Sequence, residues 1–168
     1  REEVREGHLV SQYLSSHDTD GAILTLGGDV ELFRLCTALQ MTARGIPCIF
    51  YGEEVGRDIG DWPDNRTDTP WGDRDILPGA GVQRDEDLRA FYKQLIAIRR
   101  AHPCLWRGER EGLDFGTHHL VFHRRDAETG DQLPVAVNRD AGAVTTTVAL
   151  PEGWTVGASD LLGGAVFP

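Results

Sequence analysis

The sequence is poor in lysine and has no long hydrophobic run. Lys93 is the only lysine among 168 residues, so arginine supplies almost all of the 17 basic side chains, against 27 acidic ones. The net charge of −10 predicts that neither a nucleic acid nor a membrane is a partner, because phosphate groups are bound by clustered lysine and arginine. No segment approaches the roughly 20 apolar residues that a transmembrane helix requires. A neutral substrate suits this composition better than a polyanion.

Cysteine is also scarce. Cys36, Cys48 and Cys104 do not have the spacing of a metal site, and one of the three stays unpaired in any disulfide scheme. We therefore expect small buried side chains in a reducing compartment, which favours a cytoplasmic location. The chain begins with Arg1 and not with methionine, so the absence of a targeting signal carries no conclusion.

Hydrophobic spacing in the first part of the chain predicts an α/β fold. A strand is expected over residues 9–14, a helix from Asp29 to about Arg44, and a fully apolar strand over 47–51. The side chains expected on the buried face of the helix are Leu32, Leu35, Cys36, Leu39 and Ala43. A strand, a helix and an apolar strand in this order predict a parallel βαβ unit.

The pattern changes in the second part. After a long loop over 52–84 and a second amphipathic helix over 85–101, alternating segments at 119–124, 133–138, 143–150 and 154–158 predict an antiparallel β module. We place the domain boundary between residues 104 and 105, which gives domains 1–104 and 105–168. A single βαβα stretch cannot cover its own sheet edges, so we also expect that an N-terminal part of the first domain is missing.

Polar residues directly follow the first predicted strand. His17 and Asp18 lie where the active site of a barrel of parallel strands is built, although such a pair alone is more often a simple turn. Further motifs follow in a fixed order. In sequence they are LSSHDT (14–19), GIPCIFYGEEVG (45–56), PDNR (63–66), YKQLIAIR (92–99) and HPCL (102–105).

This succession resembles the end of the catalytic domain of the alpha-amylase family (glycoside hydrolase family 13) and the domain C that follows it. The resemblance covers essentially the whole chain, and it is strongest to members that act on small maltodextrins, such as neopullulanases, cyclomaltodextrinases and alpha-glucosidases. It implies the last two βα units of a TIM (β/α)₈ barrel, followed by a truncated antiparallel β-sandwich. The implied partner is an oligosaccharide substrate, an alpha-glucan.

The resemblance also implies roles for individual residues. Asp18 matches the third catalytic carboxylate of the family, which stabilises the transition state and does not attack the sugar. His17 matches a histidine that binds sugar hydroxyls at the cleavage point, and Arg66 matches an arginine that holds the substrate. Two positions depart from the family pattern. Asp20 and Gly21 stand where an arginine is usual, and Trp62 stands where an aspartate is common. Trp62 is predicted to bind substrate by stacking on a sugar ring, or else to cover the barrel.

Retaining glycoside hydrolysis needs a nucleophile and a proton donor about 5–5.5 Å apart. In the family these two groups lie on the fourth and fifth strands, which the chain does not contain. The isolated chain is therefore expected to be inactive. Glu53 and Glu54 cannot replace the pair, because neighbours in an extended segment point to opposite faces. Structural hydrogen bonding is the expected role of these glutamates.

No cofactor and no metal ion is expected. The acidic residues between 58 and 73 lack the regular spacing of a calcium loop. His118, His119 and His123 are expected to be exposed strand residues without a carboxylate partner, which does not favour a metal site. An alternative function of a different class is a non-catalytic carbohydrate-binding or assembly module that uses tryptophan side chains as stacking platforms.

Overall fold

The computed structural model describes residues 8–57, 60–72, 83–149, 158–163 and 166–167. The chain divides into two compact units, Arg1–Lys93 and Gln94–Pro168, and the boundary falls within helix α3 (Glu86–Ala101). None of the described helices is long and apolar enough to cross a membrane. The domain limits 1–104 and 105–168 concern the domains of a larger protein and stay a prediction.

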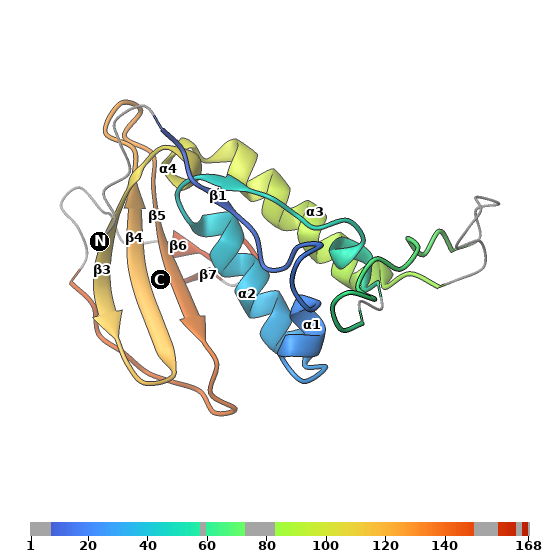
Figure 1. The fold of residues 1–168 in the computed structure, drawn as a ribbon. Helices are drawn as coiled ribbons and strands as arrows, with labels where there is room; N and C mark the ends of the chain where they lie inside the picture. The colour runs from blue at the N-terminus through green and yellow to red at the C-terminus, as the bar shows by residue number, and fades with distance from the viewer. Residues whose placement is uncertain (1–7, 58–59, 73–82, 150–157, 164–165, 168) are drawn as a thin grey trace. The chain divides into compact units, whose positions relative to one another are not determined.

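The first unit contains the expected parallel βαβ arrangement (Figure 1). Strand β1 (Ser11–Gln12) pairs in parallel with β2 (Ile46–Pro47), and helices α1 (Ala22–Thr25) and α2 (Val30–Thr42) lie between them in the chain. Both strands are shorter than expected. Asp29 caps α2 as predicted, because its carboxylate accepts a hydrogen bond of 2.9 Å from the Leu32 backbone N–H. A short 3₁₀ helix, η1 (Glu53–Val55), follows β2.

The buried face of α2 differs from the predicted one. Its fully buried residues are Phe33, Thr37, Ala38, Gln40 and Met41. Leu32, Leu35, Cys36, Leu39 and Ala43 are only half-buried. The physical reason is that Gln40 is held by hydrogen bonds. Its side-chain amide donates to the carbonyls of Gln12 in β1 and of Cys48 directly after β2, at 3.0 Å each. A polar side chain with partners is buried at low cost, and counting apolar residues does not reveal it.

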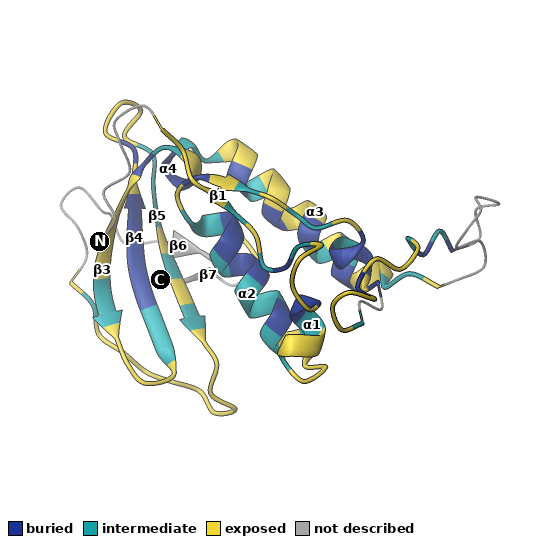
Figure 2. Ribbon diagram, viewed as in Figure 1, coloured by how far each residue is buried: buried dark blue, intermediate teal, exposed yellow. Residues whose placement is uncertain are grey.

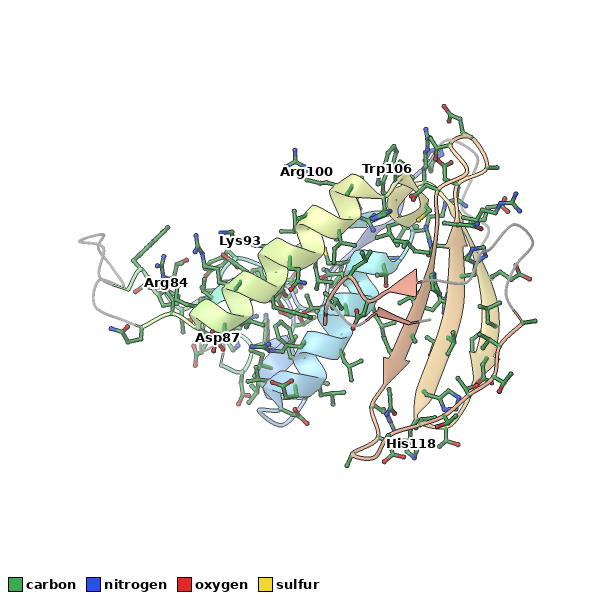
Figure 3. All side chains as sticks on the ribbon, turned by 180° about the vertical axis from the view of Figure 1, so that it is seen from behind. Arg84, Asp87, Lys93, Arg100, Trp106 and His118 are labelled. Atoms are coloured by element: carbon green, nitrogen blue, oxygen red, sulfur yellow. The ribbon has the colours of Figure 1, made fainter. Side chains whose placement is uncertain are left out.

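Helix α3 shows the predicted amphipathic pattern. Leu88, Tyr92, Leu95 and Arg99 are buried along one side. Lys93 and Arg100 are exposed and project away from the helix (Figure 3). In the first unit, the Tyr92 ring packs against Phe33 with ring centroids 6.3 Å apart, and the Tyr92 and Thr37 hydroxyls lie 3.2 Å apart.

The second unit is built on an antiparallel sheet in the order β3-β4-β5, formed by Glu109–Phe115, His119–Arg125 and Gln132–Asn138. Strand β4 is largely buried between two more exposed neighbours (Figure 2). A second pair, β6 (Ala158–Ser159) and β7 (Val166–Phe167), is also antiparallel. The antiparallel module is thus confirmed. Strand β3 was not expected, and residues 143–149 form no strand, against the prediction. Most of the segment predicted over 154–158 lies outside the described residues.

In the second unit, a buried arginine connects the sheet to the segment 104–108 that precedes it. The Arg124 guanidinium on β4 donates to the carbonyls of Cys104, Leu105 and Gly108 at 2.8–3.1 Å. Two of these carbonyls belong to helix α4 (Pro103–Trp106), whose C-terminal groups have no partner within so short a helix. Burial raises the pKa of the Cys104 thiol to about 12, as expected for a small buried side chain. Cys36 is only half-buried and Cys48 is exposed, so the burial predicted for all three cysteines is correct for one.

Candidate active site

The segment after β1 forms a tight turn that presents His17 and Asp18 to solvent. The Ser16 hydroxyl accepts a hydrogen bond of 3.2 Å from the Asp18 backbone N–H, and the Thr19 hydroxyl accepts one of 2.9 Å from the Ser16 N–H. The His17 and Asp18 side chains are 65% and 69% exposed, and His17 Nε2 lies 3.1 Å from Asp18 Oδ2. The turn therefore exposes an imidazole and a carboxylate side by side.

Arg66 lies on the other side of the same carboxylate. One of its terminal nitrogens, Nη2, is 3.9 Å from Asp18 Oδ1, and the other, Nη1, donates to the Pro63 carbonyl at 3.5 Å. The guanidinium side chain is 50% exposed. Residues 48 positions apart in the chain thus meet at one point, with a different partner on each oxygen of Asp18. These contacts are open enough to leave all three groups accessible to a ligand.

Asn65 fastens the two loops together. Its side-chain amide donates to the Ser16 carbonyl at 3.0 Å and also to the Thr19 carbonyl, so it bridges both ends of the turn that carries His17 and Asp18. Asn65 is completely buried. Asn65 was not predicted as a site residue, because a buried asparagine and an exposed loop asparagine look alike in sequence. The only signal was its position inside the motif PDNR, directly before Arg66.

Trp62 lies on the same loop and is 55% exposed. Its backbone N–H donates a hydrogen bond of 2.8 Å to Asp20 Oδ1. The structure therefore brings all four predicted site residues, His17, Asp18, Trp62 and Arg66, onto two loops that are hydrogen-bonded to each other. Their roles in binding and catalysis stay predictions.

Arg57, which was also not predicted, holds the Arg66 loop from its buried side. Arg57 is buried and donates to the Thr67 carbonyl at 2.7 Å and to the Asn65 carbonyl at 3.3 Å. Its guanidinium carbon lies 3.7 Å from the centre of the Tyr51 ring, which adds a cation–π contact. Gly52 has a φ of +85°, and a Cβ atom at that position would come within 2.7 Å of the Arg57 side chain. Glycine is therefore required there for two reasons.

Glu53 is buried and contacts Ser15, which precedes the turn that carries His17 and Asp18. Its carboxylate accepts hydrogen bonds from the Ser15 hydroxyl and from the Phe50 N–H, the latter at 3.2 Å. Burial raises the pKa of the Glu53 carboxyl above its ordinary value, although both hydrogen bonds oppose the shift. This arrangement agrees with the structural role predicted for Glu53.

Two of the three histidines differ from expectation, whereas His118 is exposed as predicted. His123 is buried and not exposed, and burial lowers its pKa. His119 has a carboxylate partner after all, because its Nε2 lies 2.7 Å from Asp114 Oδ2. The reason is that Asp114 pairs with Val121 in the β3-β4 hairpin and so lies diagonally across from His119, which spacing along one strand does not reveal. Within the described ranges, no group of three or more His, Cys, Asp or Glu residues could hold a metal ion.

The chain is similar in sequence and in structure to known proteins. No protein-family model matches the chain. A cyclomaltodextrinase of Geobacillus thermopakistaniensis is 30% identical over 156 residues, which are 92% of this chain and 25% of that protein. Neopullulanase 2 of Thermoactinomyces vulgaris is 36% identical over 95 residues, which are 56% of this chain and 15% of that protein.

A solved structure of a cyclomaltodextrinase superposes with a TM-score of 0.78 at 30% identity and covers 95% of this chain and 27% of that one. The chain thus spans about a quarter of the length of the relatives that it matches over nearly all of its own length. The resemblance found in the sequence motifs is confirmed.

Proposed function

We propose that this chain, which belongs to the alpha-amylase family of glycoside hydrolases, is the segment of a longer enzyme that carries the last two βα units of a (β/α)₈ barrel and part of the β-sandwich behind it. The parallel pair β1-β2 with α2 between its strands supports the first part of this proposal, and the antiparallel sheet β3-β4-β5 supports the second. We refer to the protein that contains all eight strands as the longer enzyme.

The surface of the β1-β2 pair supports the presence of further strands. Parallel sheets are normally buried on both faces, and a sheet of two short strands is not stable alone. Here Leu9, Val10, Tyr13 and Ile46, which lie in or beside the two strands, are exposed. Neighbouring strands of the longer enzyme would cover these apolar side chains and pair with the open strand edges.

The reaction that the site supports best is retaining hydrolysis, or transfer, of alpha-glucosidic bonds in short alpha-glucans. The observation that carries this proposal is the meeting of His17, Asp18 and Arg66 at one accessible point. In our proposal the Asp18 carboxylate stabilises the positive charge that develops on the sugar ring, while His17 and Arg66 donate hydrogen bonds to sugar hydroxyls. The carboxylate is useful only while it stays open to the substrate, as it is here.

The nucleophile and the proton donor come from other strands of the longer enzyme. Retaining hydrolysis requires two carboxyl groups about 5–5.5 Å apart on either side of the scissile bond. Glu53 does not supply one of them, because it is buried and both of its oxygens are engaged by Ser15 and Phe50. The isolated chain is therefore expected to have no hydrolytic activity.

A turnover assay tests this function. The longer enzyme and the isolated chain are incubated at equal concentration with linear maltooligosaccharides and with a cyclodextrin, and the anomeric form of the product is followed by proton NMR. We expect the longer enzyme to release products of retained configuration and the isolated chain to release none. Turnover by the isolated chain would contradict the proposal. Sugar binding without turnover by the longer enzyme would contradict it too, and would favour a carbohydrate-binding module.

A further inference from the structure

The hydrogen bond between Asp20 and Trp62 connects the two positions at which the sequence departs from the family pattern. Asp20 lies two residues after Asp18, and Trp62 lies four residues before Arg66. The Trp62 backbone N–H donates to Asp20 Oδ1 at 2.8 Å. Both residues are exposed, so this contact is not part of a hydrophobic core. A single hydrogen bond between two exposed loop residues contributes little to the free energy of unfolding. Its main effect is on the position of Trp62 relative to the Asp18 loop.

The link closes a ring of contacts around the candidate site. From Asp18 the ring passes to Arg66 at 3.9 Å and from Arg66 to the Pro63 carbonyl at 3.5 Å. Pro63 is bonded to Trp62, and the Trp62 N–H returns the ring to Asp20. The backbone of Trp62 is thus connected to the Asp18 loop by two routes, through Asp20 and through Pro63 and Arg66. Asn65 fastens the same two loops from the buried side.

The Trp62 side chain is suited to a sugar. Trp62 is 55% exposed, and the exposed residues of its loop include Asp61, Asp64 and Arg66, which can form hydrogen bonds. A large aromatic ring beside hydrogen-bonding groups is the combination that binds a glucose unit, whose two faces are lined by C–H groups and whose rim carries hydroxyls. Trp62 and Asp18 lie on two loops that are hydrogen-bonded to each other, so one oligosaccharide could contact both.

We propose that Asp20 is a positioning residue that holds Trp62 as a stacking platform for a glucose unit next to the cleaved one, so that the pair sets the enzyme's preference for longer substrates. The inference rests on the proposed function, because it assigns the neighbouring subsite of that same site. Asp20 acts through the backbone of Trp62, and the indole itself contacts the sugar.

The experiment compares four variants of the longer enzyme. Asp20→Ala removes the acceptor, whereas Asp20→Asn keeps an oxygen at that position and removes only the charge. Trp62→Ala removes the platform. Asp61→Ala is the matched control, because it removes an exposed carboxylate from the same loop. Each is assayed with maltohexaose and with an aryl alpha-glucoside that occupies only the sugar site at Asp18, and maltohexaose binding is measured by calorimetry.

Asp20→Ala is expected to raise KM for maltohexaose about two- to tenfold, the range that corresponds to the loss of one hydrogen bond. The kcat for maltohexaose and both constants for the aryl glucoside should stay within about twofold, since uniform binding alone is lost. Asp20→Asn and Asp61→Ala should behave like the unmodified enzyme. Combining Asp20→Ala with Trp62→Ala should be no worse than Trp62→Ala alone, because the two residues act as one unit.

Several results would overturn the inference: an unchanged KM for maltohexaose in Asp20→Ala, an equal loss of kcat on both substrates, or an Asp20→Asn variant that behaves like Asp20→Ala. Calorimetry separates this failure from that of the proposed function. Maltohexaose binding that Asp20→Ala leaves unchanged would contradict only the role of Asp20. The absence of both binding and turnover in the unmodified enzyme would contradict the proposed function and the inference together.

Discussion

Both units of the chain contain His–Asp pairs: His17–Asp18 in the first, and His102–Asp131 and His119–Asp114 in the second. The pairs of Asp18 and Asp114 differ in almost every other respect. His17 and Asp18 are neighbours on a turn, 3.1 Å apart, with side chains that are 65% and 69% exposed. His119 and Asp114 meet across a hairpin at 2.7 Å, and their side chains are 21% and 34% exposed. The first carboxylate has Arg66 beside its second oxygen, whereas the Thr146 hydroxyl donates to the same oxygen of Asp114 that contacts His119.

The exposed pair suits a candidate binding site, whereas the pair across the hairpin suits a structural contact. In the second unit the hairpin ladder fixes the positions of Asp114 and His119, and the pair adds one more cross-strand contact. In the first unit no strand pairing is described for the turn that carries His17 and Asp18, and a few side-chain hydrogen bonds to backbone carbonyls hold it in place. Groups that must reach a substrate are commonly placed on loops of this kind, held by a rigid scaffold.

The largest loss of stability is expected from removing Asn65, which holds the turn that carries His17 and Asp18. Asn65→Ala should lower the free energy of unfolding of the longer enzyme by about 2–4 kcal/mol, because two hydrogen bonds are lost and two carbonyls remain without their donor. It should also lower kcat, since the turn that carries Asp18 is no longer held. Denaturant unfolding and steady-state kinetics measure the two effects.

The matched control for this substitution is Asn138→Ala in the second unit. Asn138 is exposed and donates to the Gly142 carbonyl at 2.9 Å, so it also joins a side chain to a backbone carbonyl. Its loss should cost about 0.5 kcal/mol or less and leave kcat unchanged. Equal effects of the two substitutions would show that the Asn65 bridge is no more than an ordinary loop contact.

A smaller effect is expected from the His119–Asp114 pair in the second unit, and it depends on pH. Hydrogen bonds from Thr146, and then from His119, hold the pKa of the Asp114 carboxyl below its ordinary value of 3.8. A lowered pKa in the folded state stabilises the protein above the unfolded value, and this contribution is lost as the pH falls through the lowered pKa. Asp114→Asn should therefore lower the unfolding midpoint by about 1–3 °C near neutral pH, with the difference shrinking as the pH falls below 3.8. Thermal unfolding over this pH range measures it, and a difference that grows on acidification would contradict the assignment.

The motifs predicted much of the candidate site, because His17, Asp18 and Arg66 are adjacent to or within short sequence patterns. The residues that bring them together could not be predicted in the same way. Asn65 acts through carbonyls that lie 46 and 49 positions away, and Arg57 acts through the face of Tyr51 and the carbonyl of Thr67. Contacts between a side chain and distant backbone leave no periodic signal in the sequence.

The fold shows the same division. The parallel βαβ order and helix α3 follow from apolar spacing and a capping residue, and both are confirmed. Strand β3 was missed because its residues, from Glu109 to Phe115, are mostly exposed and do not alternate between apolar and polar. The strand forms because it pairs with β4, and its own sequence pattern does not indicate it. For the same reason, the alternation over 143–149 did not suffice to form a strand.

The most direct test of the central claim compares the two aspartates in the longer enzyme. Asp18→Asn and Asp114→Asn make the same chemical change in the pairs His17–Asp18 and His119–Asp114, and kcat is measured for both with a maltooligosaccharide. If Asp18 stabilises the transition state, Asp18→Asn should lower kcat by about a hundredfold or more, while Asp114→Asn leaves it within about twofold. A kcat that Asp18→Asn leaves unchanged, or that both substitutions lower equally, would contradict the account.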